Sequence, residues 1–143
     1  MTVVVRLTSG ASEVERGLAL RERVFCGEQG VSIEAERDGR DAEAAHLVAM
    51  EGERLVGTCR LLLAGGIVRL SRMAVDARSR RHGVGRTLLE GADAWAREAG
   101  AQRITLHAQM PAKSLYERAG YQVSGGPFME EGIEHVLMEK ALA

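Results

Sequence analysis

A chain of 143 residues is long enough for one domain with a buried core, and we expect residues 1–143 to form a single domain. Its formal net charge is −1 and its pI is about 6.4, so it lacks the overall basic field of nucleic-acid-binding proteins. Aromatic residues make up only 3% of the chain, which leaves few rings on which bases could stack. We therefore expect no nucleic-acid partner.

The N-terminal part predicts one strand and one helix. Residues 2–7 are rich in β-branched side chains, which is typical of a strand. The N-terminus lacks the apolar stretch of a signal peptide, and no apolar run reaches membrane-spanning length, so we expect a cytoplasmic protein with no membrane partner. Residues 12–15, Ser-Glu-Val-Glu, match a capping box, and the helix that follows would place Val14, Leu18 and Phe25 on one side.

The segment of residues 26–44 breaks the helical pattern with Gly-Glu-Gln-Gly and continues into the charged run of residues 34–43. Two interpretations remain open for it: a solvated loop, or a lid that shapes a substrate pocket. Cys26, at its start, and Cys59 lack Cys-x-x-Cys spacing, and we expect both to be reduced, buried thiols.

The middle of the chain predicts an antiparallel meander of three strands. Residues 45–50 and 55–63 are strand candidates, and the Glu-Gly-Glu-Arg sequence at residues 51–54 joins them as a hairpin. Ala-Gly-Gly at residues 64–66 then turns the chain into a third candidate, Ile67–Val75.

The clearest periodic signal follows Gly83 and predicts a helix. Gly100 stands where a helix-ending glycine belongs, and Asp93 and Arg97 are spaced to pair on the outer face. One face carries apolar residues at helical spacing: Val84, Leu88, Leu89, Ala92, Trp95, Ala96 and Ala99.

The C-terminal part predicts a strand, a short helix and a hairpin. Arg103–Gln109 alternates apolar and polar residues, which indicates a strand with one polar face. Pro111 suits the start of a helix over residues 112–119, which Gly120 would end. Residues 121–124 and 133–139 would form the hairpin, with Gly-Gly-Pro at residues 125–127 in their connection.

Several arginines and two glycines lie between the end of the third predicted strand and the start of the long predicted helix. The first turn of a helix has backbone N–H groups without an internal partner, and the helix dipole adds partial positive charge there. Glycines let an anion approach that backbone closely, and arginines add forked donors. The sequence therefore predicts a phosphate or pyrophosphate pocket built from Arg78, Arg80, Arg81, Gly83, Gly85 and Arg86.

Two common phosphate-binding motifs are excluded. A Walker A loop needs Gly-Lys-[Ser/Thr], whereas Gly85 is followed by Arg86 and Thr87. The dinucleotide fingerprint needs a third glycine where Leu88 stands, and it follows a βαβ unit rather than a meander.

What remains, Arg80-x-x-Gly83-x-Gly85 after Met73-Ala74-Val75, resembles motif A of the GNAT superfamily of acyl-CoA-dependent N-acyltransferases. The segment 112–121, Ala-Lys-Ser-Leu-Tyr-Glu-Arg-Ala-Gly-Tyr, is similar to motif B, and the predicted order of elements resembles the family over nearly the whole chain. Closer matches to the ElaA-like branch are Arg23-Val24-Phe25, Glu28-Gln29, His107-Ala108-Gln109, Glu131-Gly132-Ile133 and His135.

The resemblance implies an α/β (α+β) fold with a mixed, mostly antiparallel sheet of six to seven strands flanked by about four helices. A V-shaped opening would separate the strand Ile67–Val75 from the strand Arg103–Gln109, and acetyl-CoA would lie in it. Backbone groups of Met73 and Val75 would pair with the pantetheine as an added strand does. Family members often carry an asparagine on the motif B helix, near the position of Ser114. The implied cofactor-binding set is Met73, Ala74, Val75, Arg80, Arg81, His82, Gly83, Val84, Gly85, Arg86, Thr87 and Ser114.

Acyl transfer to an amine needs a neutral nucleophile, a stabilised oxyanion and a protonated thiolate leaving group. Tyr116 stands where many relatives carry the tyrosine that donates to the thiolate, and its alternative is an aromatic ring that fills the core. Glu28 and His107 come first as candidate bases, because the resemblance places both beside the acceptor. His46, Glu130, Glu131 and His135 are further candidates, and Arg21 and Arg23 would either recognise an acceptor carboxylate or lie solvated on their helix.

The function implied is transfer of an acetyl group from acetyl-CoA to an amine of a small molecule or protein, by direct attack in a ternary complex. The alternative is an acyl-CoA-binding sensor or interaction module without catalysis. No His, Cys, Asp and Glu grouping has metal-ligand spacing, so no metal is expected. Many relatives pair through sheet edges or tail strands, which makes a homodimer an expectation here.

Overall fold

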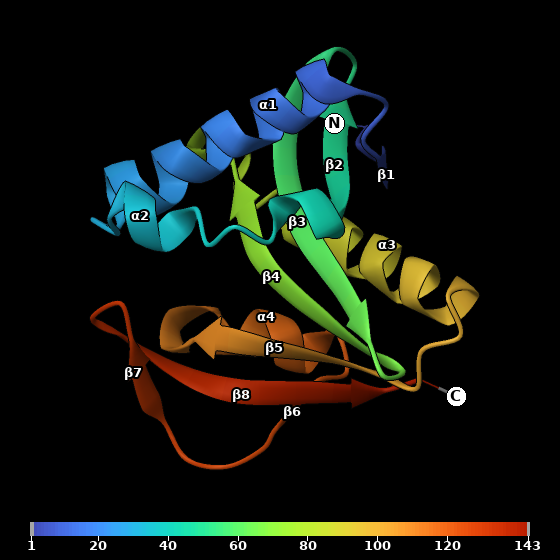
Figure 1. The fold of residues 1–143 in the computed structure, drawn as a ribbon, viewed down its shortest axis with the longest axis vertical. Coiled ribbons are helices and arrows are strands. Elements are labelled where there is room, and N and C mark those ends of the chain that lie inside the picture. Colours follow the sequence, from blue (N-terminus) through green and yellow to red (C-terminus); the bar gives the residue numbers. More distant parts are fainter. Residues whose placement is uncertain (1, 143) are drawn as a thin grey trace.

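A mixed β-sheet with helices on both faces runs through the computed structural model, which describes residues 2–142 (Figure 1). This confirms the expected fold class. The sheet has eight strands where six to seven were expected, because residues 128–130 form a short strand that was not predicted. The strands are β1 Val4–Leu7, β2 Ala45–Glu51, β3 Arg54–Ala64, β4 Ile67–Val75, β5 Arg103–Gln109, β6 Gln122–Val123, β7 Phe128–Glu130 and β8 Ile133–Ala141.

The strand order is β1-β2-β3-β4-β5-β8-β6, and β7 also pairs with β8. The predicted meander is confirmed, because β2, β3 and β4 pair antiparallel in sequence order. The expected C-terminal hairpin needs a correction. Residues 122–123 do pair with β8, but β7 lies between them in the chain and forms the tight hairpin with β8, with Gly132 at φ 73° in its turn.

The central pair of strands, β4 and β5, separates along its length. These strands run parallel and pair only over Ile67 to Arg69 with Arg103 to Thr105. Beyond Arg69 and Thr105 they diverge, and Figure 1 shows the gap widening from one end of the sheet to the other. The V-shaped opening predicted between these strands is therefore confirmed.

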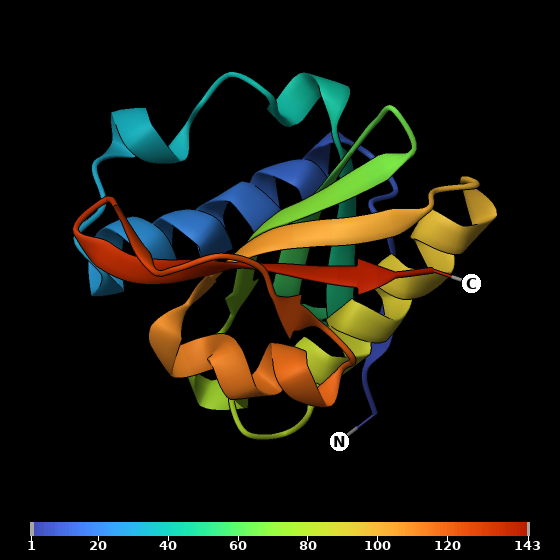
Figure 2. The ribbon, with the colours of Figure 1, turned by 90° about the horizontal axis from the view of Figure 1, so that it is seen from below.

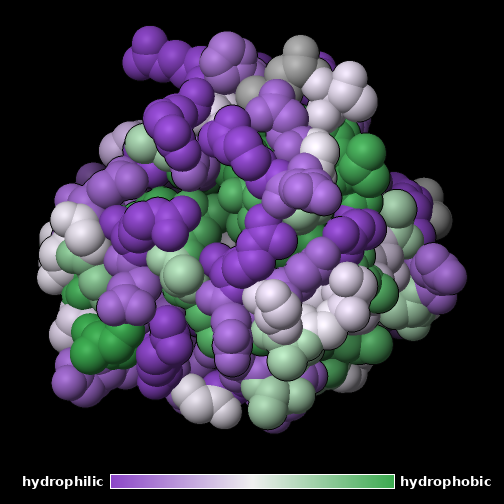
Figure 3. Space-filling model, turned by 90° about the horizontal axis from the view of Figure 1, so that it is seen from above, coloured by the Kyte–Doolittle hydropathy of each residue, from purple (hydrophilic) through white to green (hydrophobic). Residues whose placement is uncertain are grey.

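Helices cover the sheet from both sides (Figure 2). α1 Ala11–Arg21 and the short α2 Ile33–Glu36 lie on one side, where Leu20 and Val24 pack with residues of β2, β3 and β4. α3 Val84–Glu98 and α4 Lys113–Arg118 lie on the other side and enclose the larger core cluster. Hydrophilic side chains cover much of the face seen from above, on which α1 lies (Figure 3). Among residues 2–142, no helix is long and apolar enough to cross a membrane.

The start and the buried face of α1 differ from the prediction. Gly10 caps the helix without a side-chain hydrogen bond, and the carboxylate of Glu13 accepts instead from the N–H of Ser9 at 2.9 Å, so the capping box is wrong. The helix continues as a π-helix, Glu22–Glu28. Its buried residues are Gly17, Leu20, Arg21 and Val24 rather than Val14, Leu18 and Phe25.

Glycine explains part of this change of face. α1 lies close to β3 at the buried Gly17, where a Cβ would be in van der Waals contact with Oγ1 of Thr58 at 3.4 Å. A prediction based on apolar residues alone places Val14 and Leu18 on the buried face, because neither a glycine nor an arginine is expected there.

The long helix α3 follows the predicted pattern. Five of the seven predicted positions are buried, Trp95 is half-buried and Ala99 is exposed at the end. Gly83 precedes the helix at φ 81° and Gly100 follows it at φ 77°, the left-handed conformation in which glycine is unstrained. The predicted ion pair is present, with Nε of Arg97 3.4 Å from Oδ1 of Asp93.

The first turn of α3 rests on Gly57 of β3. A Cβ at this position would lie 2.8 Å from Cγ1 of Val84 and 3.1 Å from Cδ1 of Leu88. We expect Gly57→Ala to lower the free energy of unfolding by about 1–3 kcal/mol in urea denaturation, because the helix would have to shift. The control is Gly126→Ala, where a Cβ meets nothing within 4 Å, and its change should stay within about 0.5 kcal/mol. Equal stability of the two variants would contradict this packing argument.

Candidate active site

A cleft of about 920 Å³ fills the opening between β4 and β5. Val68 and Leu70 of β4 and Leu106 and Ala108 of β5 belong to the core under α3 and α4. Because side chains alternate along a strand, Arg69 and His107 face the opposite side, toward α1 and α2. The cleft thus has two halves, one next to the start of α3 and one lined by polar side chains on the α1 side.

The turn before α3 presents backbone donors to the cleft. Arg81 at φ 65° and Gly83 at φ 81° both adopt the left-handed conformation, which turns successive N–H groups toward one side as an anion-binding nest does. Within residues 2–142, the N–H groups of Arg81 to Arg86 make no hydrogen bond to a carbonyl or side chain. The helix dipole adds positive charge at the same place. This end of the cleft can hold a phosphate or pyrophosphate.

Close packing holds this turn in place. The hydroxyl of Thr87 donates to the carbonyl of Gly83 at 2.8 Å, and the carboxylate of Asp76 accepts from the N–H of Arg78 at 3.0 Å. A Cβ at Gly85 would lie 3.3 Å from Cδ2 of Leu115 on α4, so a glycine here lets the two helices approach each other. The turn is therefore supported from its own chain and from α4.

Ten of the twelve predicted cofactor-binding residues line the cleft, namely Met73, Ala74, Val75, Arg80, Arg81, His82, Gly83, Val84, Gly85 and Arg86. Thr87 and Ser114 do not: Thr87 supports the turn from behind, and Ser114 is exposed on α4. Arg118 and Ala119 also line the cleft and were not predicted. Of the four arginines around the glycines, Arg78 lies outside the cleft, where it pairs with Asp76 at 3.6 Å.

The free edge of β4 forms one wall of the cleft. Beyond Arg69, no described strand pairs with this edge. A register shift against β3 marks a bulge, and Arg72 adopts φ 54° there. The carbonyl of Val75 already accepts a hydrogen bond from Nε of Arg80 at 3.1 Å. The wall therefore offers unpaired backbone groups to an extended ligand, with one carbonyl engaged by the neighbouring turn.

Tyr116 reaches the cleft from α4. Tyr116 is 7% exposed, and no hydrogen bond joins its hydroxyl to another described residue. Burial is the main cause that raises the pKa of Tyr116 above its usual value, and the nearby thiol of Cys59 adds to the effect. The ring packs edge to face against Tyr121, with centroids 6.0 Å apart. Tyr116 is therefore both a packed aromatic ring and a protonated hydroxyl group that borders the cleft.

The two first-ranked base candidates line the cleft in different settings. The carboxylate of Glu28 pairs with Nη1 of Arg80 at 2.8 Å, so it lies next to the phosphate end. Nδ1 of His107 lies 2.8 Å from Oε2 of Glu130 on β7 and 3.1 Å from Nη2 of Arg69. The structure thus joins His107 to one of the secondary candidates, from a strand 23 residues later in the chain.

The other candidates divide between the cleft and the body of the protein. His135 and Glu131 line the cleft, and Nδ1 of His135 donates to the carbonyl of Ile133 at 2.7 Å. His46 contacts the carbonyl of Asp41 at 2.9 Å and lies outside the cleft.

Arg21 meets neither expectation stated for it. Its side chain is 2% exposed and binds Glu36 at 3.0 Å and Asp41 at 2.7 Å, so it is neither solvated nor available to an acceptor. Arg23 is exposed and lies 3.9 Å from a carboxylate oxygen of Asp76. A buried arginine at this position forms part of the structure rather than part of a binding surface.

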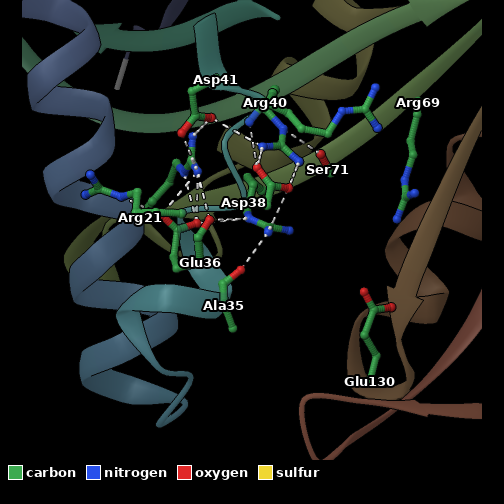
Figure 4. A network of polar contacts seen from close by, with 12 residues as sticks. Arg21, Ala35, Glu36, Asp38, Arg40, Asp41, Arg69, Ser71 and Glu130 are labelled. Atoms are coloured by element: carbon green, nitrogen blue, oxygen red, sulfur yellow. Dashed lines mark hydrogen bonds and ion pairs between the residues drawn. The ribbon is translucent and has the colours of Figure 1, made fainter.

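The charged run predicted as a loop or lid belongs to a network of ion pairs (Figure 4). Glu36 is 1% exposed, and its carboxylate binds Arg21 and also Nε of Arg72 at 2.9 Å. Asp38 binds Arg60 at 2.7 Å, and Arg60 and Arg72 hold the pKa of Asp38 well below its usual range, chiefly through the hydrogen bond from Arg60. Most of the run is exposed, as expected of a solvated loop, but Glu36 is buried and the run places Ala35 and Glu36 against the cleft.

Both cysteines are free thiols. Cys59 is fully buried, which raises its pKa to about 12, and Cys26 is half-buried. Within residues 2–142, no three His, Cys, Asp or Glu side chains are placed to share a metal ion.

Comparison with known proteins identifies the same fold and family throughout the chain. The family model of the Acetyltransferase (GNAT) domain matches residues 12–142. Bacillus subtilis YjcF, an uncharacterized N-acetyltransferase, is 33% identical over 135 residues, which cover 94% of this chain and 96% of that protein.

Solved structures agree. A Lactobacillus plantarum protein assigned to the N-acetyltransferases is 30% identical with a TM-score of 0.91, over 100% of both chains. Escherichia coli ElaA has the same fold at 21% identity, with a TM-score of 0.86 over 97% of this chain and 99% of its own. A GNAT family acetyltransferase from Elizabethkingia anophelis, solved with acetyl-CoA bound, has a TM-score of 0.76 at 14% identity, over 98% of both chains.

Proposed function

Because the chain belongs to the GNAT acetyltransferase family, we propose that it transfers the acetyl group of acetyl-CoA to an amine by direct attack in a ternary complex. The observation that carries this proposal is the position of the cleft. It begins at unpartnered N–H groups before α3, follows the free edge of β4 and passes the hydroxyl of Tyr116. A diphosphate, an extended amide chain and a thioester have chemistry that fits these three parts in that order.

The residues of the cleft fit acetyl-CoA, which when bound supplies an activated acetyl group. N–H groups from Arg81 to Arg86 would hold the pyrophosphate, with the guanidinium groups of Arg81 and Arg86 adding charge. Arg80 already binds Glu28 and the Val75 carbonyl, so it stabilises the turn as well as the local charge. The unpaired edge of β4 near Met73 would bind the amides of the pantetheine.

The chain supplies two proton-handling groups on opposite sides of the cleft. Tyr116 borders the α3–α4 half and would donate to the departing thiolate. A tyrosine hydroxyl is protonated at neutral pH, so it can donate its proton to the thiolate when the carbon–sulfur bond breaks. His107 lies on the other side, and the contact with Glu130 leaves its Nε2 to accept the proton of the attacking amine.

A screen for CoA release tests this function. The purified chain would be incubated with acetyl-CoA together with one candidate acceptor at a time. The candidates are amines, polyamines, amino acids, aminoglycosides and peptides, and the free thiol of CoA would be measured over time. We expect amine-dependent release for at least one class, together with acetyl-CoA binding by calorimetry that is tighter than binding of NADH or ATP. Tight acetyl-CoA binding without release for any amine would favour a sensor without catalysis, and preference for NADH or ATP would contradict acetyl-CoA as the ligand.

A further inference from the structure

In the half of the cleft on the α1 side, which we call the acceptor half, one ring nitrogen has two neighbours and can form a hydrogen bond with only one of them. Nδ1 of His107 lies within hydrogen-bonding distance of both Oε2 of Glu130 at 2.8 Å and Nη2 of Arg69 at 3.1 Å. A carboxylate only accepts and a guanidinium only donates, whereas a ring nitrogen either carries a proton or accepts one. Nδ1 can therefore bond to one of the two partners at a time.

The carboxylate is the stronger partner. Both hydrogen bonds would involve an ionised partner, and the contact with Glu130 is the shorter of the two, at 2.8 Å against 3.1 Å. Nδ1 of His107 then carries the proton and donates to Glu130. In this arrangement Nη2 of Arg69 faces an N–H group and has no hydrogen-bond acceptor among residues 2–142.

No other acidic group of the described chain serves Arg69. No carboxylate lies within 4.0 Å of its guanidinium, because the acidic residues on this side bind other arginines. Glu28 binds Arg80, Glu36 binds Arg21 and Arg72, and Asp38 binds Arg60 and Arg72. Arg69 is thus a forked hydrogen-bond donor on the cleft wall that has no acidic partner among the described residues.

The position of Arg69 points to the acceptor substrate. Arg69 forms the last pair between β4 and β5, so it lies where the opening begins. Figure 4 shows its guanidinium and the carboxylate of Glu130 directed toward each other from β4 and β7. Oε1 of Glu130 has no hydrogen-bond partner among residues 2–142, so the two side chains present opposite charges across a short gap.

We propose that Arg69 binds a carboxylate of the acceptor, and that the acceptor is an amino acid whose amine lies next to Glu130 and His107. Both charged groups approach the same ring nitrogen, so their separation suits a small zwitterion in which the ammonium and carboxylate groups are close together. The forked guanidinium matches a carboxylate in a bidentate arrangement. This proposal rests on the proposed function, since it names the substrate class of the same site.

Matched pairs of acceptors test the role of Arg69. For each amino acid in a panel, the free acid and its α-amide would be compared as acceptors at saturating acetyl-CoA. We expect the wild type to prefer the acid by about 10- to 100-fold in kcat/KM, the range for a hydrogen bond between charged groups. Arg69→Met should remove this preference by raising KM for the acid, with KM for the amide unchanged.

The control is Arg103→Met. Arg103 lies on the same face of β5 as His107, is exposed and does not line the cleft, so its loss should leave the preference intact. A wild type that acetylates acids and amides equally, or an Arg69→Met variant that keeps the preference, would overturn the proposal. Faster acetylation of a lysine side chain in a peptide than of any free amino acid would also overturn it.

A binding measurement separates this proposal from the proposed function. With CoA saturating, each acid should raise the Tm of the wild-type chain more than its amide does, and Arg69→Met should abolish the difference. If amines release CoA but no acid stabilises the protein more than its amide, the carboxylate site is wrong and acetyl transfer stands. If no amine releases CoA, acetyl transfer is wrong, and the difference in Tm still decides whether Arg69 binds a carboxylate.

Discussion

Tyr116→Phe is expected to lower kcat by about 100-fold or more while leaving acetyl-CoA affinity nearly unchanged. General acid catalysis contributes about 10²–10⁴-fold to the rate, and the Tyr116 hydroxyl borders the cleft without a hydrogen-bond partner among residues 2–142. The substitution removes only that oxygen, so the ring still packs against Tyr121. Steady-state kinetics of CoA release and calorimetry with acetyl-CoA would measure the two quantities.

Tyr121→Phe is the matched control. Tyr121 is also buried, its pKa is also raised by burial, and its hydroxyl has no hydrogen-bond partner among residues 2–142, but it does not line the cleft. Its loss should leave turnover unchanged, and stability should remain equal or increase, since an unpartnered buried hydroxyl is removed. Equal kcat for Tyr116→Phe and Tyr121→Phe would remove Tyr116 from the proton-donor role.

Glu36→Ala is expected to lower the free energy of unfolding by about 3–5 kcal/mol. This carboxylate is buried and binds Arg21 and Arg72, and Arg21 is itself almost fully buried. Removal of one partner leaves charge in the interior with fewer compensating contacts, which costs about 3–5 kcal/mol in other proteins. Urea denaturation followed by circular dichroism would measure the change.

Glu43→Ala provides the comparison within the same charged run. Glu43 is exposed and pairs with Arg40 on the surface, where such a pair contributes at most about 1 kcal/mol. A loss of stability in Glu36→Ala no larger than in Glu43→Ala would show that the network does not hold this segment. Activity should also fall in Glu36→Ala under conditions where the variant is folded, because Arg72 forms the bulge in the cleft wall.

The sequence allowed prediction of the parts of the site that lie close together in the chain. The turn before α3 depends on Gly83, Gly85 and the arginines around them. It is followed directly by a helix whose apolar residues recur at helical spacing. Tyr116 could be named because it stands within a ten-residue motif of a known family. Local chemistry and short-range periodicity were sufficient for the turn, whereas the role of Tyr116 came from the resemblance to a family motif.

The acceptor half could not be predicted in the same way, because its contacts join distant segments. His107 and Glu130 meet only when β7 folds back on β8, and β7 was too short to recognise beside Gly125 and Gly126. Arg21 looked like a surface residue of a helix, since its partners lie 15 and 20 residues later in a run that resembled a loop. Alternating acidic and basic residues in that run were a signal of pairing, but they do not name the partners.

The most direct test of acetyl-CoA binding is a crystal structure of the chain with acetyl-CoA. We expect the pyrophosphate oxygens within about 3 Å of backbone nitrogens between Arg81 and Arg86, and the thioester between β4 and β5 on the side of Tyr116. A coenzyme bound elsewhere, with those N–H groups still without a ligand, would contradict the account.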